Sequence, residues 1–159
     1  MVSLVVHALL GIAVVWFTIV SNAKIFHRPT GGPRFSALEI AFWAIGLASL
    51  PLCWYFNINY VQQYSADPFW GEGANWAQFI SLGYANPAAA SASADYTIIN
   101  VLLLPLFTII DGRRRGIRHP WLFFASSLFT SCAFAFAFYF ATIERQRRHN
   151  LADVVASRA

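Results

Sequence analysis

Four long apolar stretches, separated by polar segments, dominate the pattern of this chain. They cover residues 2–20, 37–56, 94–110 and 121–142. Each residue of an α-helix adds about 1.5 Å along its axis, so about 20 residues cross the roughly 30 Å hydrocarbon core of a bilayer. The pattern therefore predicts an all-α polytopic membrane bundle of about four transmembrane helices.

The fourth stretch contains a second, conflicting pattern. Residues 133–138 alternate strictly between Ala and Phe, as a half-buried β-strand would. The apolar run around them is much longer than a strand, however, and a lone strand leaves its backbone groups unpaired in lipid. We therefore expect a helix here.

Two shorter signals refine the prediction. Ser36 and Glu39 form an S-x-x-E capping box directly before the second stretch, which marks the start of a helix. Aromatic and apolar residues recur at helical spacing over 74–84, which indicates a short helix lying on the membrane surface. The alternative for 74–84 is a water-exposed segment that covers the mouth of the bundle.

The loop charges predict an orientation. The loops 21–36 and 111–120 together carry seven Lys and Arg residues, whereas residues 57–93 carry none. Positively charged loops stay in the cytoplasm. We therefore expect a multi-pass protein of the plasma membrane, with 21–36 and 111–120 cytoplasmic and 57–93 outside.

The C-terminal region does not fit this orientation. Residues 1–148 read as one transmembrane domain and 149–159 as a flexible polar tail. With four spans both termini lie outside, yet this end of the chain is also basic: it carries Arg145, Arg147, Arg148 and Arg158.

Composition agrees with a membrane protein. The chain is 58% hydrophobic and 11% charged, against about 25% charged residues in a soluble domain. The net charge of +4 comes from clusters between apolar runs, not from a basic face that would bind nucleic acid. The expected partners are membrane lipids, with a second copy of the chain or another membrane protein as further partner, and no nucleic acid.

Polar side chains at membrane depth are the candidate ligand-binding residues. In the four-span orientation most of them fall toward the outer side, where they would converge on one cavity mouth. A His and an Asp there could perform acid–base chemistry or bind a polar head group. Helix capping, packing and interhelical hydrogen bonds are the structural alternatives. The candidates are Asp95, His7, Asn57, Asn59, Asn100, Tyr139 and Glu144.

Sequence motifs for catalysis, metals or cofactors are missing. The chain has no H-E-x-x-H, no P-loop, no G-x-G-x-x-G and no G-x-S-x-G. Its four His residues lack the spacing of metal ligands, and Cys53 and Cys132 form no C-x-x-C. We predict no cofactor and no metal.

Several short motifs carry a resemblance to a known family. They are Asn86-Pro87, Ser93-Ala94-Asp95, Asp111-Gly112-Arg113-Arg114, Gly116 and Trp121. Over roughly residues 41–148 the chain resembles a family of small bacterial integral membrane proteins known only as a domain of unknown function. The resemblance implies three helices with a loop between the first two, and no activity. The additional first helix, and Asp111 where Glu is expected, depart from the pattern.

The leading functional hypothesis is a non-enzymatic membrane protein, either an accessory subunit or a lipid-associated module. One alternative is a small membrane enzyme or binding protein for a lipid or isoprenoid-like molecule, with its site around Asp95 and His7. A transporter or channel subunit is the second alternative. The enzyme hypothesis requires Asp95 in a pocket beside another titratable group, whereas the subunit hypothesis requires an exposed face of small residues.

Overall fold

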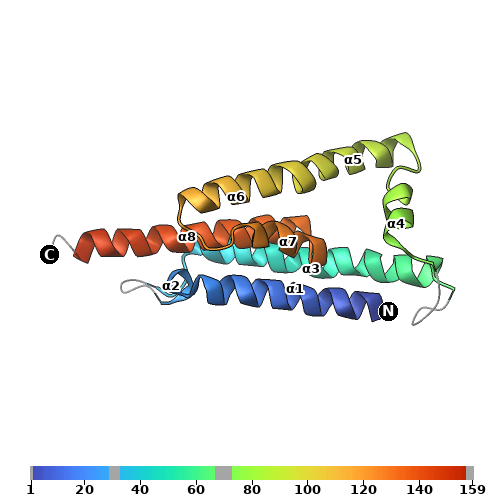
Figure 1. Ribbon diagram of the computed structural model, residues 1–159. Helices are drawn as coiled ribbons and strands as arrows, with labels where there is room; N and C mark the ends of the chain where they lie inside the picture. Colours follow the sequence, from blue (N-terminus) through green and yellow to red (C-terminus); the bar gives the residue numbers. More distant parts are fainter. Residues whose placement is uncertain (1, 29–32, 67–72, 157–159) are drawn as a thin grey trace.

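The computed structural model describes residues 2–28, 33–66 and 73–156, and the regular secondary structure of this part of the chain is helical apart from one isolated bridge between Ser65 and Gly73. Figure 1 shows the helices lying roughly along one common direction, except for a short helix at one end. Their bounds are α1 (Val2–Ser21), α2 (Ala23–Phe26), α3 (Ala37–Tyr64), α4 (Trp76–Leu82), α5 (Pro87–Thr97), η1 (Ile98–Leu103), α6 (Leu104–Arg114), α7 (Trp121–Phe129) and α8 (Cys132–Ala156).

Within the described residues, three helices are long and apolar enough to cross a membrane. They are α1 with 20 residues, α3 with 28, and the continuous helix of 28 residues formed by α5, η1 and α6. The last begins at Pro87, earlier than the apolar stretch 94–110 suggests. The side chain of Asn86 accepts a hydrogen bond from the Ala89 amide, and Pro87 occupies the first helical turn, where its missing N–H costs nothing.

The predicted fourth span, 121–142, is not confirmed as one helix. It is divided into α7 and α8 at Thr130 and Ser131. Thr130 has φ −120° and ψ −96°, outside the helical region. The chain reverses direction here, so α7 and α8 form a helical hairpin (Figure 1).

Contacts with α1 show how far α7 reaches. At the start of the hairpin the His119 ring stacks on Phe17, near the C-terminal end of α1, with 5.8 Å between ring centroids. At the end of α7, Phe129 and Thr130 lie against Gly11, in the middle of α1. Helix α7 therefore runs antiparallel to α1 and covers only about half of its length.

Contacts with α3 show that α8 returns to the end where α7 began. The hydroxyls of Ser131 and Ser49 share a hydrogen bond of 2.8 Å near the middle of α3. Further on, Arg145 pairs with Glu39 in the first turn of α3. One loop joins α1 to α3, so the C-terminal end of α1 and the first turn of α3 lie at the same end of the bundle. We call it the basic end.

Where the helix is interrupted between α7 and α8, nearby side chains form hydrogen bonds with the backbone. Such bonds are needed at membrane depth, because no water is available there. The Ser131 hydroxyl accepts a hydrogen bond from the Phe134 amide at 3.0 Å. The Thr130 hydroxyl donates to the Ser126 carbonyl at 2.6 Å. Irregular backbone is tolerated at membrane depth where it is enclosed by protein, and here α1 and α3 flank it.

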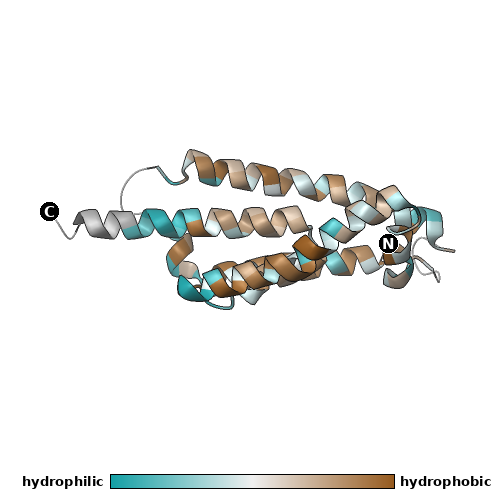
Figure 2. Cartoon of the chain, turned by 90° about the horizontal axis from the view of Figure 1, so that it is seen from above, coloured by the Kyte–Doolittle hydropathy of each residue, from teal (hydrophilic) through white to brown (hydrophobic). Residues whose placement is uncertain are grey.

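The hairpin also supplies most of the buried core. Phe123, Phe134, Phe138 and Tyr139 pack together, all at most 5% exposed, whereas α1 and α3 expose many large apolar side chains, as helices in contact with lipid do. The Ala–Phe alternation is thus helical: Phe134 and Phe138 lie four residues apart on the buried face. Figure 2 shows apolar residues along the middle of the helices and hydrophilic ones in the second half of α8.

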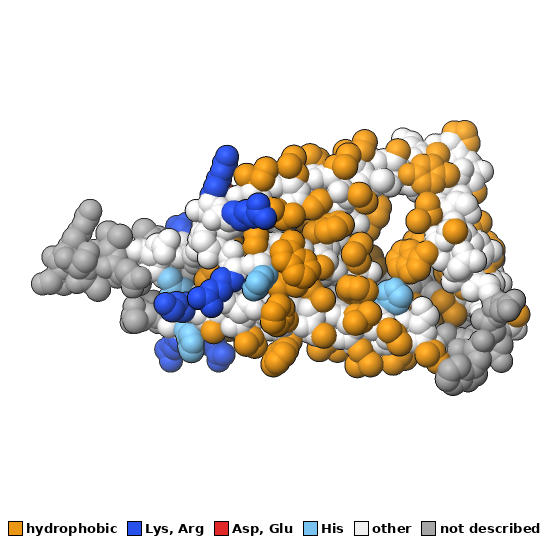
Figure 3. Space-filling view, viewed as in Figure 1, with side chains coloured by type: hydrophobic (Ala, Val, Ile, Leu, Met, Phe, Trp, Pro, Cys, Tyr) orange, Lys and Arg blue, Asp and Glu red, His pale blue; other side chains and the backbone are white. Residues whose placement is uncertain are grey.

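The hairpin changes the predicted topology. With three spanning helices and a returning hairpin, the second half of α8 lies at the basic end, beside the loops 21–36 and 111–120. The chain begins at one end of the bundle and ends at the other (Figure 1), so the structure does not support the prediction that both termini share a side, and the four-helix count is not confirmed. Figure 3 shows the Lys and Arg side chains on one face gathered at this end.

A short helix, α4, is present within the range 74–84 for which the sequence predicts a surface helix. The Asn75 side chain caps it by accepting a hydrogen bond from the Gln78 amide at 2.9 Å. Trp76 lies 5.6 Å from the His7 ring, centroid to centroid, so α4 contacts the N-terminal half of α1. It is found at the end opposite the basic end (Figure 1).

The hairpin predicts a specific pattern of cysteine labelling. In a Cys53→Ala/Cys132→Ala background, Arg113→Cys and Asn150→Cys should react with an impermeant maleimide from the same side of intact membranes. Ser81→Cys on α4 should react only from the other side. All three positions are exposed. Labelling of Asn150→Cys together with Ser81→Cys would show that the fourth stretch crosses after all.

Candidate functional site

The most charged part of the structure surrounds Glu39 at the basic end. Its carboxylate is 1% exposed and accepts hydrogen bonds from two guanidinium groups, Arg145 at 2.5 Å and Arg148 at 3.2 Å. Arg145 is 5% exposed, so the pair is withdrawn from water. A buried charge needs such a partner, because desolvation of an isolated ion costs several kcal/mol.

The same two arginines hold the loop between α1 and α3. Arg145 donates to the carbonyls of Phe26 at 3.2 Å and His27 at 3.3 Å, and its guanidinium lies 5.1 Å from the centre of the Phe35 ring. Arg148 donates to the Pro33 and Arg34 carbonyls. The second half of α8 is therefore fixed to both sides of this loop.

Glu144 belongs to the same cluster, not to the outer side where the four-span topology placed it. It accepts a hydrogen bond from the Ser36 hydroxyl at 3.1 Å and two from Arg147 at 2.9 Å. The bond from Arg147 lowers the pKa of Glu144 below its ordinary value, against the opposing effect of burial, and Ser36 adds to the lowering. Ser36 also caps α3, since its hydroxyl accepts a hydrogen bond from the Glu39 amide.

Tyr139 likewise lies toward the basic end. Its hydroxyl donates to Asp111 at 2.7 Å, and Asp111 also pairs with Arg115 at 2.6 Å. The neighbouring Gly112 is required by space: a Cβ atom there would lie 2.5 Å from Cβ of Pro120. This contact brings the start of α7 against the end of α6.

The remaining candidates lie away from the basic end and do not form one cluster. His7 donates from Nδ1 to the Ser3 carbonyl at 2.7 Å and packs between Trp76 and Phe129. Asn57 and Asn59 are half-buried on α3. Asp95 is exposed on α5, with no hydrogen bond or ion pair to the described residues.

Asn100 occupies an unusual position in the third spanning helix. It is 6% exposed and sits in the π-helical turn η1, a geometry often found at functional sites. Its amide donates to the Tyr96 hydroxyl at 3.2 Å, a contact within the same helix rather than the expected one between helices. Its Oδ1 atom is buried without a partner among the described residues.

Sequence reasoning missed the arginines of this site. It treated Glu39 as a helix cap and assigned Arg145 and Arg148 to the outer side. A usable signal was their spacing, since residues three apart share one face of a helix. A lone acid at the start of one apolar helix can pair with two arginines that share a face at the end of another apolar helix.

The basic end also carries cations that no described acid neutralises. Within the described residues the four ion pairs involve Arg115, Arg145, Arg147 and Arg148. Six other described, exposed cations have no ion pair to the described residues and are left to solvent or to an anion, and no group of three or more His, Cys, Asp or Glu among the described residues could hold a metal. This arrangement is suited to binding anions. The six are Lys24, Arg28, Arg34, Arg113, Arg114 and Arg118.

Removal of the Glu39 carboxylate should destabilise the protein strongly. We expect Glu39→Leu to lower the free energy of unfolding in mixed micelles by about 3–5 kcal/mol, because it leaves buried guanidinium charge unpaired. The double variant Glu39→Leu/Arg145→Met should recover part of the loss. The surface control Arg113→Gln should stay within about 0.5 kcal/mol of wild type. Equal losses in the single and double variants would contradict this account.

Acidification should remove the stabilisation that ionised Glu144 contributes to the folded state. Because its folded-state pKa is lowered, its stabilisation is present above the ordinary value of about 4.5 and is lost as the pH falls through the folded-state pKa. We expect Glu144→Gln to melt below wild type at neutral pH and the difference to vanish at the most acidic pH values below 4.5. A difference in melting temperature that is constant with pH would argue against the ionised contact.

Comparison with known proteins identifies a family and nothing more. No curated protein and no solved structure matches the chain. The profile of a family described as a protein of unknown function, DUF2834, matches residues 41–145, more than half of the 159 residues. The match confirms the resemblance to an uncharacterised family that the short motifs indicated. The chain therefore belongs to the DUF2834 family.

Proposed function

We propose that the protein is a non-enzymatic, lipid-associated membrane module whose basic end binds anionic lipid head groups. One observation carries the proposal: every described Lys and Arg lies at the basic end. The hairpin adds the arginines of α8 to those of the two loops, so a single cationic surface flanks one end of an apolar bundle. Cations beside a membrane attract the anionic lipids of the adjacent leaflet.

The same asymmetry supports an orientation in the plasma membrane. Residues 57–93 contain no Lys or Arg, and positively charged segments stay in the cytoplasm. In this proposal the loops 21–36 and 111–120 face the cytoplasm together with the end of α8. The segment that contains α4 lies outside.

A second candidate, an accessory subunit, is favoured by the surface of α5. This helix is rich in Ala and Ser and has no buried residue. Small residues let helices approach closely in a membrane, and the exposed Asp95 would find a hydrogen-bond donor on a partner.

The enzyme alternative has less support, because it needs Asp95 in a pocket beside a second titratable group. The channel alternative rests on Asn100 alone.

Lipid selectivity tests the proposal. We expect native mass spectrometry of the protein released from mixed micelles to show preferential retention of phosphatidylglycerol over phosphatidylcholine. Because the preference is electrostatic, it should weaken with salt and in Arg113→Gln/Arg114→Gln. The control Asp95→Asn, at the other end of the same spanning helix, should keep it.

Three other results would count against this function. Equal retention of the two lipids by wild type would contradict head-group binding. Loss of a bound small molecule in Asp95→Asn would favour the ligand or enzyme alternative. A protein partner lost in the same variant would favour the accessory subunit.

A further inference from the structure

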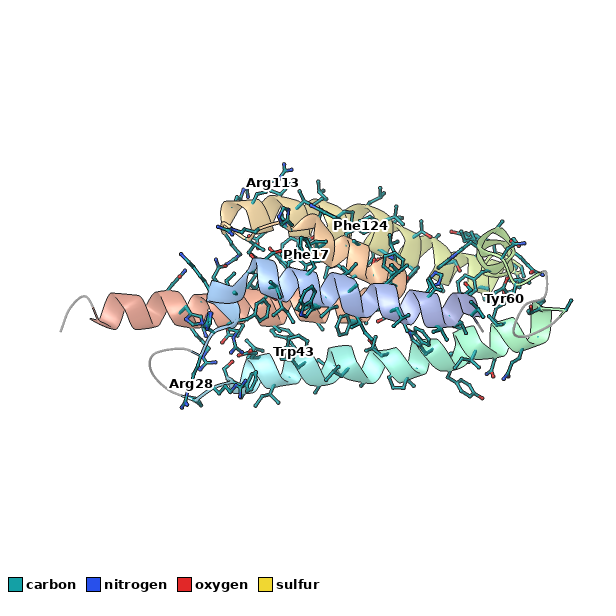
Figure 4. The ribbon with its side chains drawn as sticks, turned by 60° about the horizontal axis from the view of Figure 1, so that its bottom comes forward. Phe17, Arg28, Trp43, Tyr60, Arg113 and Phe124 are labelled. Carbon is teal, nitrogen blue, oxygen red and sulfur yellow. The ribbon has the colours of Figure 1, made fainter. Side chains whose placement is uncertain are left out.

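A groove runs along the bundle between α1 and α3. Its volume is about 540 Å³, and the tip of the hairpin forms its floor, with Phe129, Thr130 and Phe134. Helices α1 and α3 make the two walls, since both pack on the hairpin. Figure 4 shows α1 and α3 with Trp43 of α3 nearer the basic end, where it packs on Phe138 and does not line the groove.

The lining of the groove is apolar. No charged side chain contributes to it, and the one hydroxyl, that of Thr130, is already bound to the Ser126 carbonyl at 2.6 Å. Two of its largest side chains, Trp16 and Trp54, stand on opposite walls. A molecule in this groove therefore places a hydrocarbon part there, because nothing in the lining compensates a buried polar group.

The groove is long enough for part of an acyl chain. Along α1 it extends from Ala8 to Ile19, which is roughly 16 Å at about 1.5 Å per residue, and half of a hydrocarbon core of about 30 Å is close to this value. Along α3 its lining runs only from Leu47 to Trp54, on both sides of Ser49 at the hairpin tip. The groove therefore lies around the level of the tip and extends furthest toward the basic end along α1.

Cations stand where the groove ends. Beyond Ile19, at the C-terminal end of α1, the chain continues into the loop that carries Lys24 and Arg28, both exposed and without an ion pair to the described residues. Figure 4 shows Arg28 at the end of the space between α1 and α3. An apolar channel that leads to free cations is complementary to an amphiphile with an anionic head.

We infer that this groove binds one acyl chain of an anionic phospholipid, with the phosphate of the head group against Lys24 and Arg28. The inference rests on the proposed function for the charge of the lipid, and it adds a defined site for the chain. The hairpin is essential to this site, because a straight fourth span would leave no tip at mid-depth to form the floor.

A matched pair of substitutions tests the groove. Ile12 lines it and is 67% exposed, whereas Leu9 on the same helix is 61% exposed and outside it. We expect Ile12→Trp to reduce retention of phosphatidylglycerol in native mass spectra by at least about five-fold, with Leu9→Trp unchanged. If Ile12→Trp is not monodisperse, Ile12→Phe with Leu9→Phe serves as the pair.

The cations are tested separately. Lys24→Gln/Arg28→Gln should lower retention of phosphatidylglycerol to the level of phosphatidylcholine with the same acyl chains. The control is the double variant Arg113→Gln/Arg114→Gln, on the other loop. It should still retain the phosphatidylglycerol that Ile12→Trp displaces, although its overall preference for anionic lipids is lower.

The possible failures are distinguishable. Equal retention by Ile12→Trp and Leu9→Trp overturns the groove, while a remaining preference for phosphatidylglycerol leaves the proposed function standing. Displacement of both lipids alike by Ile12→Trp overturns the assigned anionic head group, and the proposed function falls with it only if wild type also retains the two lipids equally. A dimer that Ile12→Trp dissociates also overturns the inference, because the occupant is then a second copy of the chain.

Discussion

The buried contact of Glu39 with Arg145 and Arg148 is the constraint on which the rest of the architecture depends. It joins the first turn of α3 to the second half of α8, and so requires the chain after α7 to return to the end from which it came. Charged groups are costly in the hydrocarbon core, so this contact favours a position of the second half of α8 outside it. The reversal at Thr130 and the common location of the basic segments follow from this requirement.

The hairpin explains what sequence could and could not predict. Hydropathy located α1, α3 and α6 because each carries an uninterrupted apolar run. It failed at Thr130 because a stretch buried in a hairpin is as apolar as one that crosses, so length and composition do not distinguish them. The misplacement of Tyr139 and Glu144 has the same origin. Besides the spacing of Arg145 and Arg148, an informative signal was the conflict between the basic C-terminal region and the predicted orientation.

The family motifs acquire physical roles from the structure. Asn86 caps α5, and the Ser93 hydroxyl donates a hydrogen bond to the Gly83 carbonyl at 2.8 Å. Asp111 accepts a hydrogen bond from the Tyr139 hydroxyl, and Gly112 leaves space for Pro120. These are contacts that build the fold, and no functional group is needed to explain them. Asp95 is different: it is exposed at a position where a membrane protein rarely places an acid, and it stabilises nothing in the described part of the chain.

Taken together, the ionic contact and the hairpin create the groove as a consequence of packing. Because α7 ends at Gly11 and α8 begins beside Ser49, α1 and α3 each pack on the hairpin, and the space between them stays open above its tip. A small bundle could close this space only with more side-chain volume on α1 or α3. Lipid is an abundant molecule that fits this apolar space, and in the proposed function the cations of the neighbouring loop would select among lipids by charge. The interaction that holds α8 at the basic end thus also positions the floor on which an acyl chain would lie.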